Sequence, residues 1–528
     1  MTPTPTSVGT SPLPRSTPEA VGVDPAGVLA FLDDVDAHGI ELHSVMLVRH
    51  GRVAAEGWWH PYGPERVHLL YSLSKTFTSA ALGFAVAEGL VDLDATVLSY
   101  FPELDAEVTD PRSRSVLVRH VAAMASGHAE ETHDDAWELS PDDLVRGFLL
   151  IPPQHEPGTH FAYNQPCTYA LAAILQRRAG VTLTEYLGPR LFAPLGITVG
   201  GWQQAPPGQD LGFSGLHLTT EAVARFGRLL LDDGMLDGRR VLPAGWVDLA
   251  SRVHVATAAS GGETPAGASG GDWAQGYGFQ LWRSRHGYRG DGAFGQFCVV
   301  LPEHDAVLVT TAGTEDMQGI LDAAWAHLLP AFGEVPAGGA AGRDGSAAEG
   351  GSTADGGRAR SAAARALTDR LAALTLPLPV GGAPLTEVAF QAGRAGQGRA
   401  ERLELRRVAA HWEVEVDVDG QTWVAQAGDG RWAVTEPTDR QHALAVAAAA
   451  TGTGAVHVDV VLLETPHRLT LVGDGAGTLT TRWHTEPLGP VPLSMQRPLP
   501  GVPAPEEPSP DARVAGDAPT GGEAPTAR

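Results

Sequence analysis

The chain nearly lacks lysine. Lysine and arginine together number 37 among its 528 residues, and Lys75 is the single lysine among 36 arginines. Arginine stays protonated in proteins and cannot accept a proton, whereas a neutral lysine amine can. A chain that uses arginine for its other basic side chains is expected to keep lysine where proton transfer requires it. Lys75 is therefore the first candidate catalytic residue.

Cysteine and long apolar runs are also scarce. The two cysteines, Cys167 and Cys298, form no metal or redox spacing, so we predict that both are small buried apolar residues. No run of 18 apolar residues is present, which argues against a transmembrane helix. The first 20 residues, MTPTPTSVGTSPLPRSTPEA, lack the apolar core of a secretory signal. The expected protein is cytoplasmic and has no disulfide.

Basic charge is in deficit. The formal net charge is -25, which disfavours nucleic acid and anionic membranes as partners, because phosphate binding needs basic patches. With nucleic acid and membranes disfavoured, the expected partner is a small-molecule substrate. The sequence does not indicate the oligomeric state.

Composition divides the chain into five segments. Residues 1–16 are rich in Thr, Pro and Ser and are expected to be disordered, and residues 17–332 alternate helical and strand patterns. Residues 333–360 have the Gly/Ala-rich composition of a flexible linker. Residues 361–500 begin with a short helical pattern and continue as a β-rich domain, and residues 501–528 read as a disordered tail.

Hydrophobic patterns predict the elements of the two folded segments. ELHSVMLVRHGRVAAEGWW and QFCVVLPEHDAVLVTTAG read as strand hairpins, whereas SKTFTSAALGFAVAEGL reads as a buried helix. Helices and antiparallel strands thus share the first domain, which indicates an α/β or α+β fold. After residue 400, alternating stretches with a turn at Asp419-Gly420 predict an all-β domain of about eight strands.

Ser72 and Lys75 stand three residues apart at the start of the predicted buried helix, so their side chains share one helix face. A hydroxyl is a weak nucleophile until a base removes its proton. Burial lowers a lysine pKa and so favours the neutral amine that can act as this base. The free N–H groups at the helix N-terminus also favour an oxyanion beside Ser72.

The stretch YSLSK resembles the active-site signature of the serine β-lactamase and penicillin-binding-protein superfamily. VLVRHVAAMASGH, PGTHFAYNQPCTYALAAILQRRAG and GDGAFGQFCVVLPEHDAVLVTT are similar, in order, to segments of its class C-like branch of esterases, D-amino-acid peptidases and amide hydrolases. The resemblance covers roughly residues 17–332. It implies an α+β fold of the β-lactamase/transpeptidase type, with an antiparallel sheet flanked by helices and a helical subdomain, here followed by the C-terminal all-β domain.

The resemblance implies a second catalytic element of the form Tyr-x-Asn. The matching residues here are Tyr163, Asn164 and Gln165. Tyr163 would relay a proton to the leaving group. Gln165 stands where the family has asparagine and keeps an amide that is one methylene longer. Gln165 and Asn164 are the expected substrate contacts of this element.

The third element of the family is Lys-Thr-Gly or His-x-Gly on the strand that lines the site. The matching stretch here is Gly290-Asp291-Gly292, followed by Ala293, so the cation is absent. The resemblance implies that the backbone N–H groups of Ser72 and Ala293 hold the oxyanion, because such donors need no side chain. Asp291 and Gly292 are expected at the substrate.

Two other signals are weak. GASGG around Ser269 matches G-x-S-x-G, but it lies in a loop pattern rather than between a strand and a helix. His120, His128 and His133 lie near several acidic residues, but their spacing fits no metal template. No metal or other cofactor is expected.

These residues predict a serine hydrolase that cleaves ester or amide bonds through a Ser72 acyl-enzyme, most simply a small-ester carboxylesterase or amidase. Two alternatives stay open. One is a β-lactamase or D-alanyl-D-alanine peptidase. The other is a non-catalytic ligand-binding protein of the same fold, for which an acyl-enzyme that never turns over would be the sign.

Overall fold

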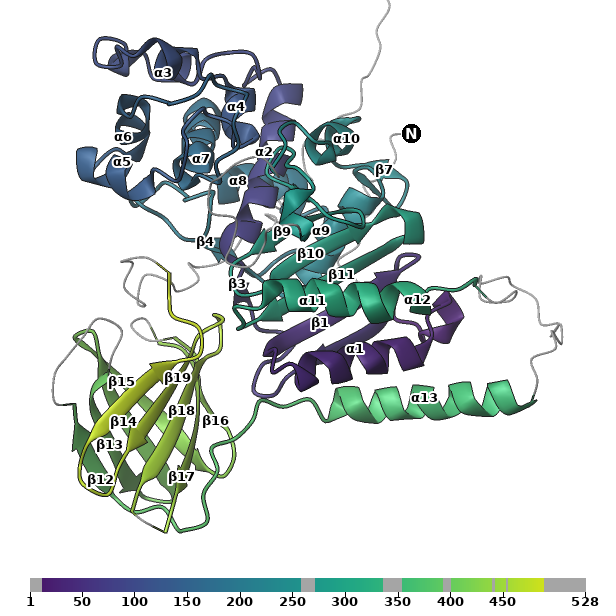
Figure 1. The fold of residues 1–528 in the computed structure, drawn as a ribbon, viewed down its shortest axis with the longest axis vertical. Helices are drawn as coiled ribbons and strands as arrows, with labels where there is room; N and C mark the ends of the chain where they lie inside the picture. Colours follow the sequence, from purple (N-terminus) through teal and green to yellow (C-terminus); the bar gives the residue numbers. More distant parts are fainter. Residues whose placement is uncertain are drawn as a thin grey trace, which may run out of the picture.

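The computed structural model describes residues 12–257, 271–335, 354–392, 400–438, 442–452 and 454–488. Figure 1 shows a larger part that mixes helices and strands, and a smaller part near the C-terminus that is built from strands. The predicted G-x-S-x-G around Ser269 lies outside the described residues, as do most of the predicted linker, the tail and the first 11 residues.

A six-stranded antiparallel sheet forms the centre of the larger part, with the strand order β2-β1-β11-β10-β9-β8. Every residue of β1 and of β11 is buried, which requires cover on both faces of the sheet. The hairpins expected from the sequence are β1–β2 and β10–β11. The strands are β1 Leu42–Arg49, β2 Arg52–Trp58, β8 Trp282–Arg283, β9 Tyr288–Gly292, β10 Gln296–Leu301 and β11 Ala306–Ala312.

Helices cover both faces of this sheet (Figure 1). Helices α1 (Pro25–Ala37), α11 (Met317–Ala323) and α12 (Leu329–Ala331) pack together on one face, and α9 (Thr220–Leu231) packs on the other against β1, β10 and β11. Helix α9 is preceded by the N-cap residue Thr219, whose side chain accepts a hydrogen bond from the Ala222 N–H. Cys298 on β10 is fully buried and free, and so is Cys167, as predicted.

A helical subdomain lies beyond one end of the sheet (Figure 1). Helix α2 connects it to the sheet, and ten consecutive residues of α7 are buried among its neighbours. The helices are α2 Ser74–Ala87, α3 Pro111–Ser115, α4 Val118–Ala122, α5 His133–Leu139, α6 Leu144–Leu150, α7 Gln165–Ala179, α8 Leu183–Leu187 and, near the sheet, α10 Trp246–Ser251. Short strands complete this part: β3 His68–Leu69, β4 Gly201–Trp202, β5 Leu216–Leu218, β6 Met235–Leu236 and β7 Arg239–Arg240.

The C-terminal β part contains nine strands among the described residues, in the order β12-β13-β14-β15-β17-β18-β19-β20, with β16 beside β17. Neighbours run antiparallel except β15 and β17. The β14–β15 turn falls at Asp419-Gly420, where the sequence predicts it, with positive φ at both residues. The strands are β12 Val388–Gln391, β13 Ala400–Val408, β14 His411–Val418, β15 Gln421–Asp429, β16 Ala433–Thr435, β17 Leu444–Ala450, β18 Val456–Leu462, β19 Arg468–Gly473 and β20 Leu479–Trp483. Antiparallel sheet, flanking helices, helical subdomain and C-terminal β part together confirm the expected fold class.

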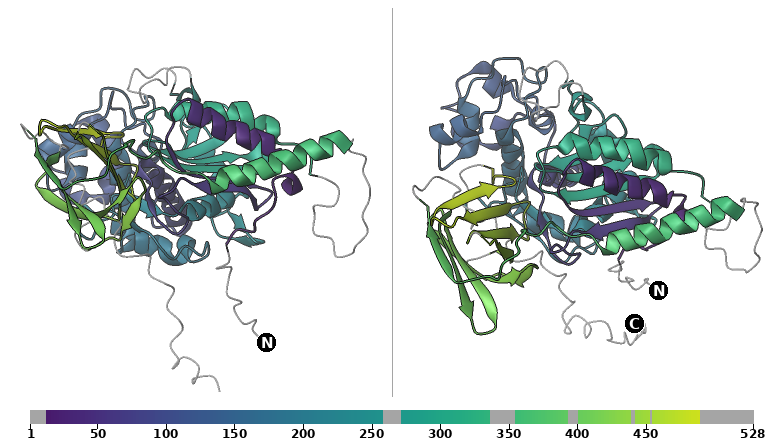
Figure 2. Two further views of the ribbon diagram at one scale, coloured as in Figure 1. Left: turned by 90° about the horizontal axis from the view of Figure 1, so that it is seen from below. Right: turned by 60° about the horizontal axis from the view of Figure 1, so that its bottom comes forward.

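Helix α13 (Ala354–Ala372) begins inside the segment predicted to be a linker and is longer than the helix expected there. Its second half runs along α1 and the edge strand β2 (Figure 2), with Leu367 and Leu374 buried in the main core. Arg370 forms an ion pair with Asp36 on α1. The alanines of α13 favour a helix, and its contacts with α1 and β2 stabilise it further.

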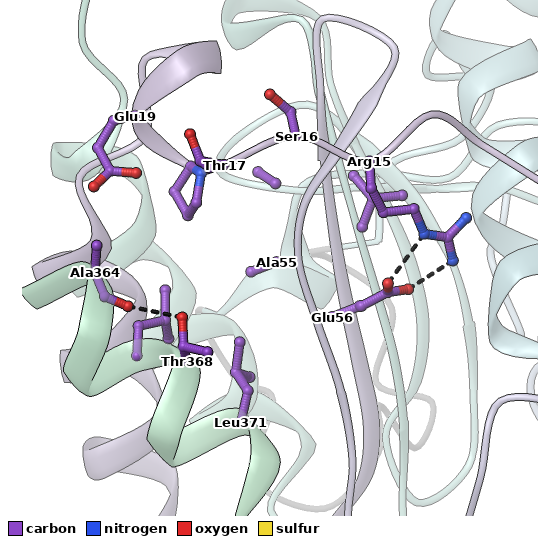
Figure 3. Close-up of a pocket in the computed structure, with 13 residues that line it drawn as sticks. Arg15, Ser16, Thr17, Glu19, Ala55, Glu56, Ala364, Thr368 and Leu371 are labelled. Carbon is purple, nitrogen blue, oxygen red and sulfur yellow. Dashed lines mark hydrogen bonds and ion pairs between the residues drawn. The ribbon is translucent and has the colours of Figure 1, made fainter.

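A pocket of about 570 Å³ lies between α13, β2 and the N-terminal segment (Figure 3). Arg15 lies beside it and bonds Glu56 at 2.7 Å and Glu221 at 2.8 Å. None of the predicted catalytic residues lines this pocket.

The β part and the larger part share a hydrophobic interface. Ala443, Ala445, Ala447 and Leu463 belong to the same buried cluster as the core of the larger part. The neighbours of these alanines in β17, such as Leu444 and Val446, instead fill the separate core of the β part. Strand β17 is therefore buried on both faces, and the two parts are packed against each other.

Candidate active site

Ser72 lies in a tight turn between β3 and α2. Residues Tyr71–Leu73 form one 3-10 turn, and α2 begins at Ser74. Ser72 is partly exposed, whereas Lys75, one turn further on, is 1 % exposed. The i, i+3 spacing brings Lys75 Nζ to 2.9 Å from Ser72 Oγ, as the sequence predicts.

Lys75 Nζ has two more hydrogen-bond partners, and both are oxygen atoms that can accept but not donate. The side-chain oxygen of Gln165 lies at 2.6 Å and the carbonyl oxygen of Phe213 at 2.9 Å. A neutral amine has two N–H groups and one lone pair. When its N–H groups donate to Gln165 and Phe213, its lone pair is left for the Ser72 hydroxyl, the only one of the three partners that can donate.

Burial lowers the pKa of Lys75 to about 7, far below the ordinary value of a lysine. The negative charges of Glu131 and Asp291 act in the opposite direction but do not outweigh the loss of solvation. A large fraction of Lys75 is therefore neutral near pH 7, which suits a general base.

Tyr163 lies beside both groups and is partly exposed. Its hydroxyl interacts with Ser72, and Lys75 Nζ lies 4.8 Å from its ring centroid. Trp282 stacks on the ring at a centroid distance of 5.4 Å and holds its orientation. Burial raises the pKa of Tyr163 well above the ordinary value, so the phenol keeps its proton and can donate it.

The two residues after Tyr163 differ in position. Gln165 opens α7 and is partly exposed next to Lys75, so its longer side chain reaches the lysine. The sequence predicts a substrate contact for Asn164, but the structure buries it completely. Asn164 Oδ1 accepts a hydrogen bond from the Thr132 N–H at 3.2 Å. The amide of Asn164 therefore holds the chain just before α5 against the start of α7.

Glu131 was not singled out by the sequence pattern as a member of this site. Its carboxylate accepts a hydrogen bond from the Gln165 N–H at 3.0 Å and so lies at the N-terminus of α7. Burial raises its pKa, while the charge of Lys75 lowers it. The proximity to Lys75 could not be inferred from a sequence separation of 56 residues.

Strand β9 passes so close to the Ser72 turn that only glycine fits. A Cβ atom on Gly292 would lie 2.0 Å from the Leu70 carbonyl oxygen, and one on Gly290 would lie 2.3 Å from Thr76 Oγ1. The clash at Gly292 is with backbone and could be relieved only by moving the strand or the turn, whereas the clash at Gly290 is with side chains. Ala293 follows directly and is partly exposed, so its backbone lies next to the nucleophile turn.

Asp291 is paired rather than free. Its Oδ2 atom accepts a hydrogen bond from Arg289 Nε at 3.0 Å, and both side chains are buried. Arg289 also donates to Ser284 Oγ at 2.5 Å and lies over Trp273 at 4.4 Å from the ring centroid. The sequence indicates that the family's cation is missing, and the structure shows that Arg289, the partner of Asp291, is buried in the protein interior.

The histidines weighed as metal ligands make other contacts. His128 bonds Ser126 Oγ and the Ile151 carbonyl, each at 2.9 Å, and His120 accepts a hydrogen bond from the Leu117 N–H. Within the described ranges, no group of three or more His, Cys, Asp or Glu residues could hold a metal ion. Nor does any helix in those ranges have the length and apolar character needed to cross a membrane.

The arrangement of Ser72, Lys75 and Tyr163 agrees with a comparison of the whole chain with protein families. The Beta-lactamase family model matches residues 30–331, which is more than half of the chain. The chain belongs to the beta-lactamase family. The matched range contains every residue discussed in this site.

Named relatives of this beta-lactamase family member have several activities. A 6-aminohexanoate-dimer hydrolase of Paenarthrobacter ureafaciens is 30 % identical over 223 residues, covering 38 % of this chain and 55 % of that protein. A lovastatin esterase of Penicillium rubens is 28 % identical over 169 residues, covering 28 % of this chain and 42 % of that protein. The chain thus spans about half the length of the curated relatives it matches.

Among solved structures, a putative 6-aminohexanoate-dimer hydrolase from Bacillus anthracis matches 61 % of this chain and 87 % of that chain. The sequence identity is 19 % and the TM-score is 0.48.

Proposed function

We propose that the chain is a serine hydrolase that cleaves ester or amide bonds through an acyl-enzyme on Ser72. The observation that carries the proposal is the position of Lys75 Nζ, 2.9 Å from Ser72 Oγ and shielded from water, with two acceptors for its N–H groups. This is the geometry of a nucleophile with its base already in place.

Acylation follows from these contacts. Ser72 Oγ attacks the substrate carbonyl carbon while its proton passes to the lone pair of Lys75. The carbonyl oxygen becomes an oxyanion, which accepts hydrogen bonds from the Ser72 and Ala293 N–H groups. The C–O or C–N bond to the leaving group then breaks. The Tyr163 hydroxyl gives its proton to the leaving group and regains one from Lys75.

Deacylation reverses the roles. A water molecule attacks the acyl carbon, and its proton passes through the Tyr163 hydroxyl to Lys75. The bond to Ser72 Oγ breaks, and Lys75 returns this proton to Ser72 Oγ as the carboxylic acid product leaves. No metal or redox cofactor enters these steps.

Short uncharged esters and small amides are the proposed substrates. Recognition of a substrate carboxylate needs a cation that can reach it, and Arg289 is buried and bonded to Asp291. The loss of one charge-assisted contact, about 1.5–3 kcal/mol, weakens binding roughly tenfold to a hundredfold. The named relatives, a 6-aminohexanoate-dimer hydrolase and a lovastatin esterase, are hydrolases and support the reaction type, not the choice of uncharged substrates.

The test compares kcat/KM for p-nitrophenyl butyrate, a short p-nitroanilide and a chromogenic cephalosporin, with Ser72→Ala as the control. We expect ester hydrolysis that disappears in Ser72→Ala. A fluorophosphonate should modify the peptide that contains Ser72. Modification of the peptide that contains Ser269 instead would refute the assignment of the nucleophile.

Two outcomes would favour the alternatives. Cephalosporin hydrolysis at roughly 10⁶ M⁻¹s⁻¹ or above would make the chain a β-lactamase or a D-alanyl-D-alanine peptidase relative. A burst of one acyl group per chain with no further turnover on any substrate would make it a ligand-binding protein.

A further inference from the structure

We propose that His467, in the C-terminal β part, is a positioning residue that holds the Ser72 turn and the backbone at Ala293 in the geometry of an oxyanion hole. The inference rests on the proposed acyl-enzyme chemistry and adds a residue far from it in sequence. It is carried by the contacts of His467 with Tyr71, which precedes Ser72, and with Phe294, which follows Ala293.

Tyr71 has a backbone conformation that a bulky residue rarely adopts. Its φ is 47°, in the left-handed region, and it stands immediately before the proposed nucleophile. Strained residues persist only where surrounding contacts hold them, and a relaxed Tyr71 would reorient the Ser72 N–H. The side chain of Tyr71 is 7 % exposed, so the contacts that restrain it are internal.

The hydroxyl of Tyr71 is fixed by the β part. It lies 2.7 Å from His467 Nε2. His467 Nδ1 lies 2.9 Å from the Thr485 carbonyl oxygen, which can only accept, so Nδ1 carries the proton and Nε2 accepts from Tyr71. Burial lowers the pKa of His467 to about 3, which keeps the ring neutral and this pattern intact.

The same histidine contacts the second proposed oxyanion donor. Phe294 packs edge-on against His467 at 5.6 Å and against Tyr71 at 5.5 Å between ring centroids. Phe294 also has positive φ, 68°, directly after Ala293. Two strained residues, each adjoining one proposed donor, therefore share a single support.

That support is firmly docked. His467 ends a loop, residues 463–467, between β18 and β19, and we call this segment the docking loop. The Leu69 N–H donates to the Glu464 carbonyl at 2.8 Å, and the Tyr62 hydroxyl donates to the Thr465 carbonyl at 3.1 Å. Arg468, the next residue, forms a buried ion pair with Glu41 at 2.6 Å.

The experiment uses the full chain and p-nitrophenyl butyrate. His467→Ala removes the acceptor, whereas His467→Gln can still accept from Tyr71 and donate to Thr485. His457→Ala is the matched control, because His457 lies on β18 of the same sheet and forms no part of the docking loop. Tyr71→Phe removes only the hydroxyl and keeps the ring packing.

We expect His467→Ala and Tyr71→Phe each to lower kcat by about 10- to 100-fold with KM within threefold of the parent, since a small misplacement of catalytic groups has effects of this size. The double variant should lose no more than either single variant, because both remove one bond. His467→Gln should recover to within about fivefold of the parent, and His457→Ala should be unchanged.

If Tyr71→Phe folds with an unchanged melting midpoint and keeps the kcat of the parent, the inference is wrong, whether or not His467→Ala folds. Equal losses in His467→Gln and His467→Ala would also overturn it. A parent chain that neither hydrolyses esters nor reacts with a fluorophosphonate at Ser72 would instead overturn the proposed function, and the inference with it.

Discussion

The larger part and the C-terminal β part approach the Ser72 turn from two sides and contribute different kinds of side chain. The larger part brings Lys75, Gln165 and Tyr163, which lie at the nucleophile. The β part brings His467, which reaches the nucleophile only through Tyr71. Groups that move protons are recognisable by residue type, whereas a group that holds a backbone in place is recognisable only by its contacts.

Within the β part, strand β14 has one face in solvent, whereas strand β17 lies at the interface with the larger part. β14, HWEVEVDV, alternates between buried and less buried residues, as expected for a strand with one face in solvent. β17, LAVAAAA, is buried throughout. A strand that is buried along its whole length needs cover on both faces, and small alanines allow the larger part to approach closely. The pattern of β17 therefore signals an interface.

The largest effect should come from the group that moves the proton. Lys75→Arg keeps the positive charge but removes the amine that can be neutral, so kcat/KM for an ester should fall roughly 100- to 10,000-fold. The melting midpoint measured by circular dichroism should fall, because the larger arginine stays charged in a buried site, so activity is compared at a temperature where both proteins are folded. Activity within a few-fold of the parent would mean that the single lysine is an accident of composition.

A charge should destabilise the interface between the β part and the larger part far more than it destabilises the solvent-exposed face of the β part. Ala447 is completely buried between the two parts, so Ala447→Asp should destabilise the chain by about 3–5 kcal/mol. Val408, at the end of β13, is 37 % exposed, and Val408→Asp is the matched control, expected within about 0.5 kcal/mol of the parent. Denaturant unfolding measures both. Equal midpoints for the two variants would contradict a docked β17.

The pH profile should report the buried lysine. Only the neutral amine of Lys75 can accept the proton of Ser72, and burial lowers its pKa to about 7. kcat/KM should therefore fall as pH drops through 7, by about tenfold per pH unit below that, and level off above it. The measurement is kcat/KM for p-nitrophenyl butyrate between pH 5 and 9. A profile that is flat from pH 5 to 7 would exclude Lys75 as the base.

The smallest effect should come from the open face of the β part. Arg402 on β13 bonds Asp417 and Glu404, at 2.8 and 2.7 Å, on a partly exposed surface. Arg402→Ala should cost at most about 1 kcal/mol in the free energy of unfolding, and less at high salt, because water and ions screen such pairs. Activity should not change. A loss of activity would show that both faces of the β part act on the site.

Much of the fold could be predicted from sequence because its signals are local. The β1–β2 and β10–β11 hairpins, the buried helix α2 and the β14–β15 turn follow from periodicity and turn residues within 20 positions or fewer. The second half of α13 falls in the predicted helical pattern, whereas its first seven residues fall in the segment predicted to be a linker.

In the candidate site, residues that are close in sequence could be predicted, whereas residues that the fold brings together could not. Ser72 and Lys75 are three residues apart, so one helical turn brings them together whatever else the chain does. The sequence assigned a substrate contact to Asn164, which the structure buries against Thr132, because the face that a loop residue presents is decided by its neighbours in space. Glu131 and Arg289 were missed for the same reason.

The sequence by itself determined which groups can do the chemistry, because a nucleophile and a deprotonatable amine are properties of residue type and of one helical turn. The tertiary structure alone decided how those groups are held. Gln165 and Phe213 come to Lys75 across 90 and 138 residues, and His467 comes to Tyr71 across 396. No local pattern records such contacts, because they exist only after the hydrophobic cores have formed and have brought distant segments together.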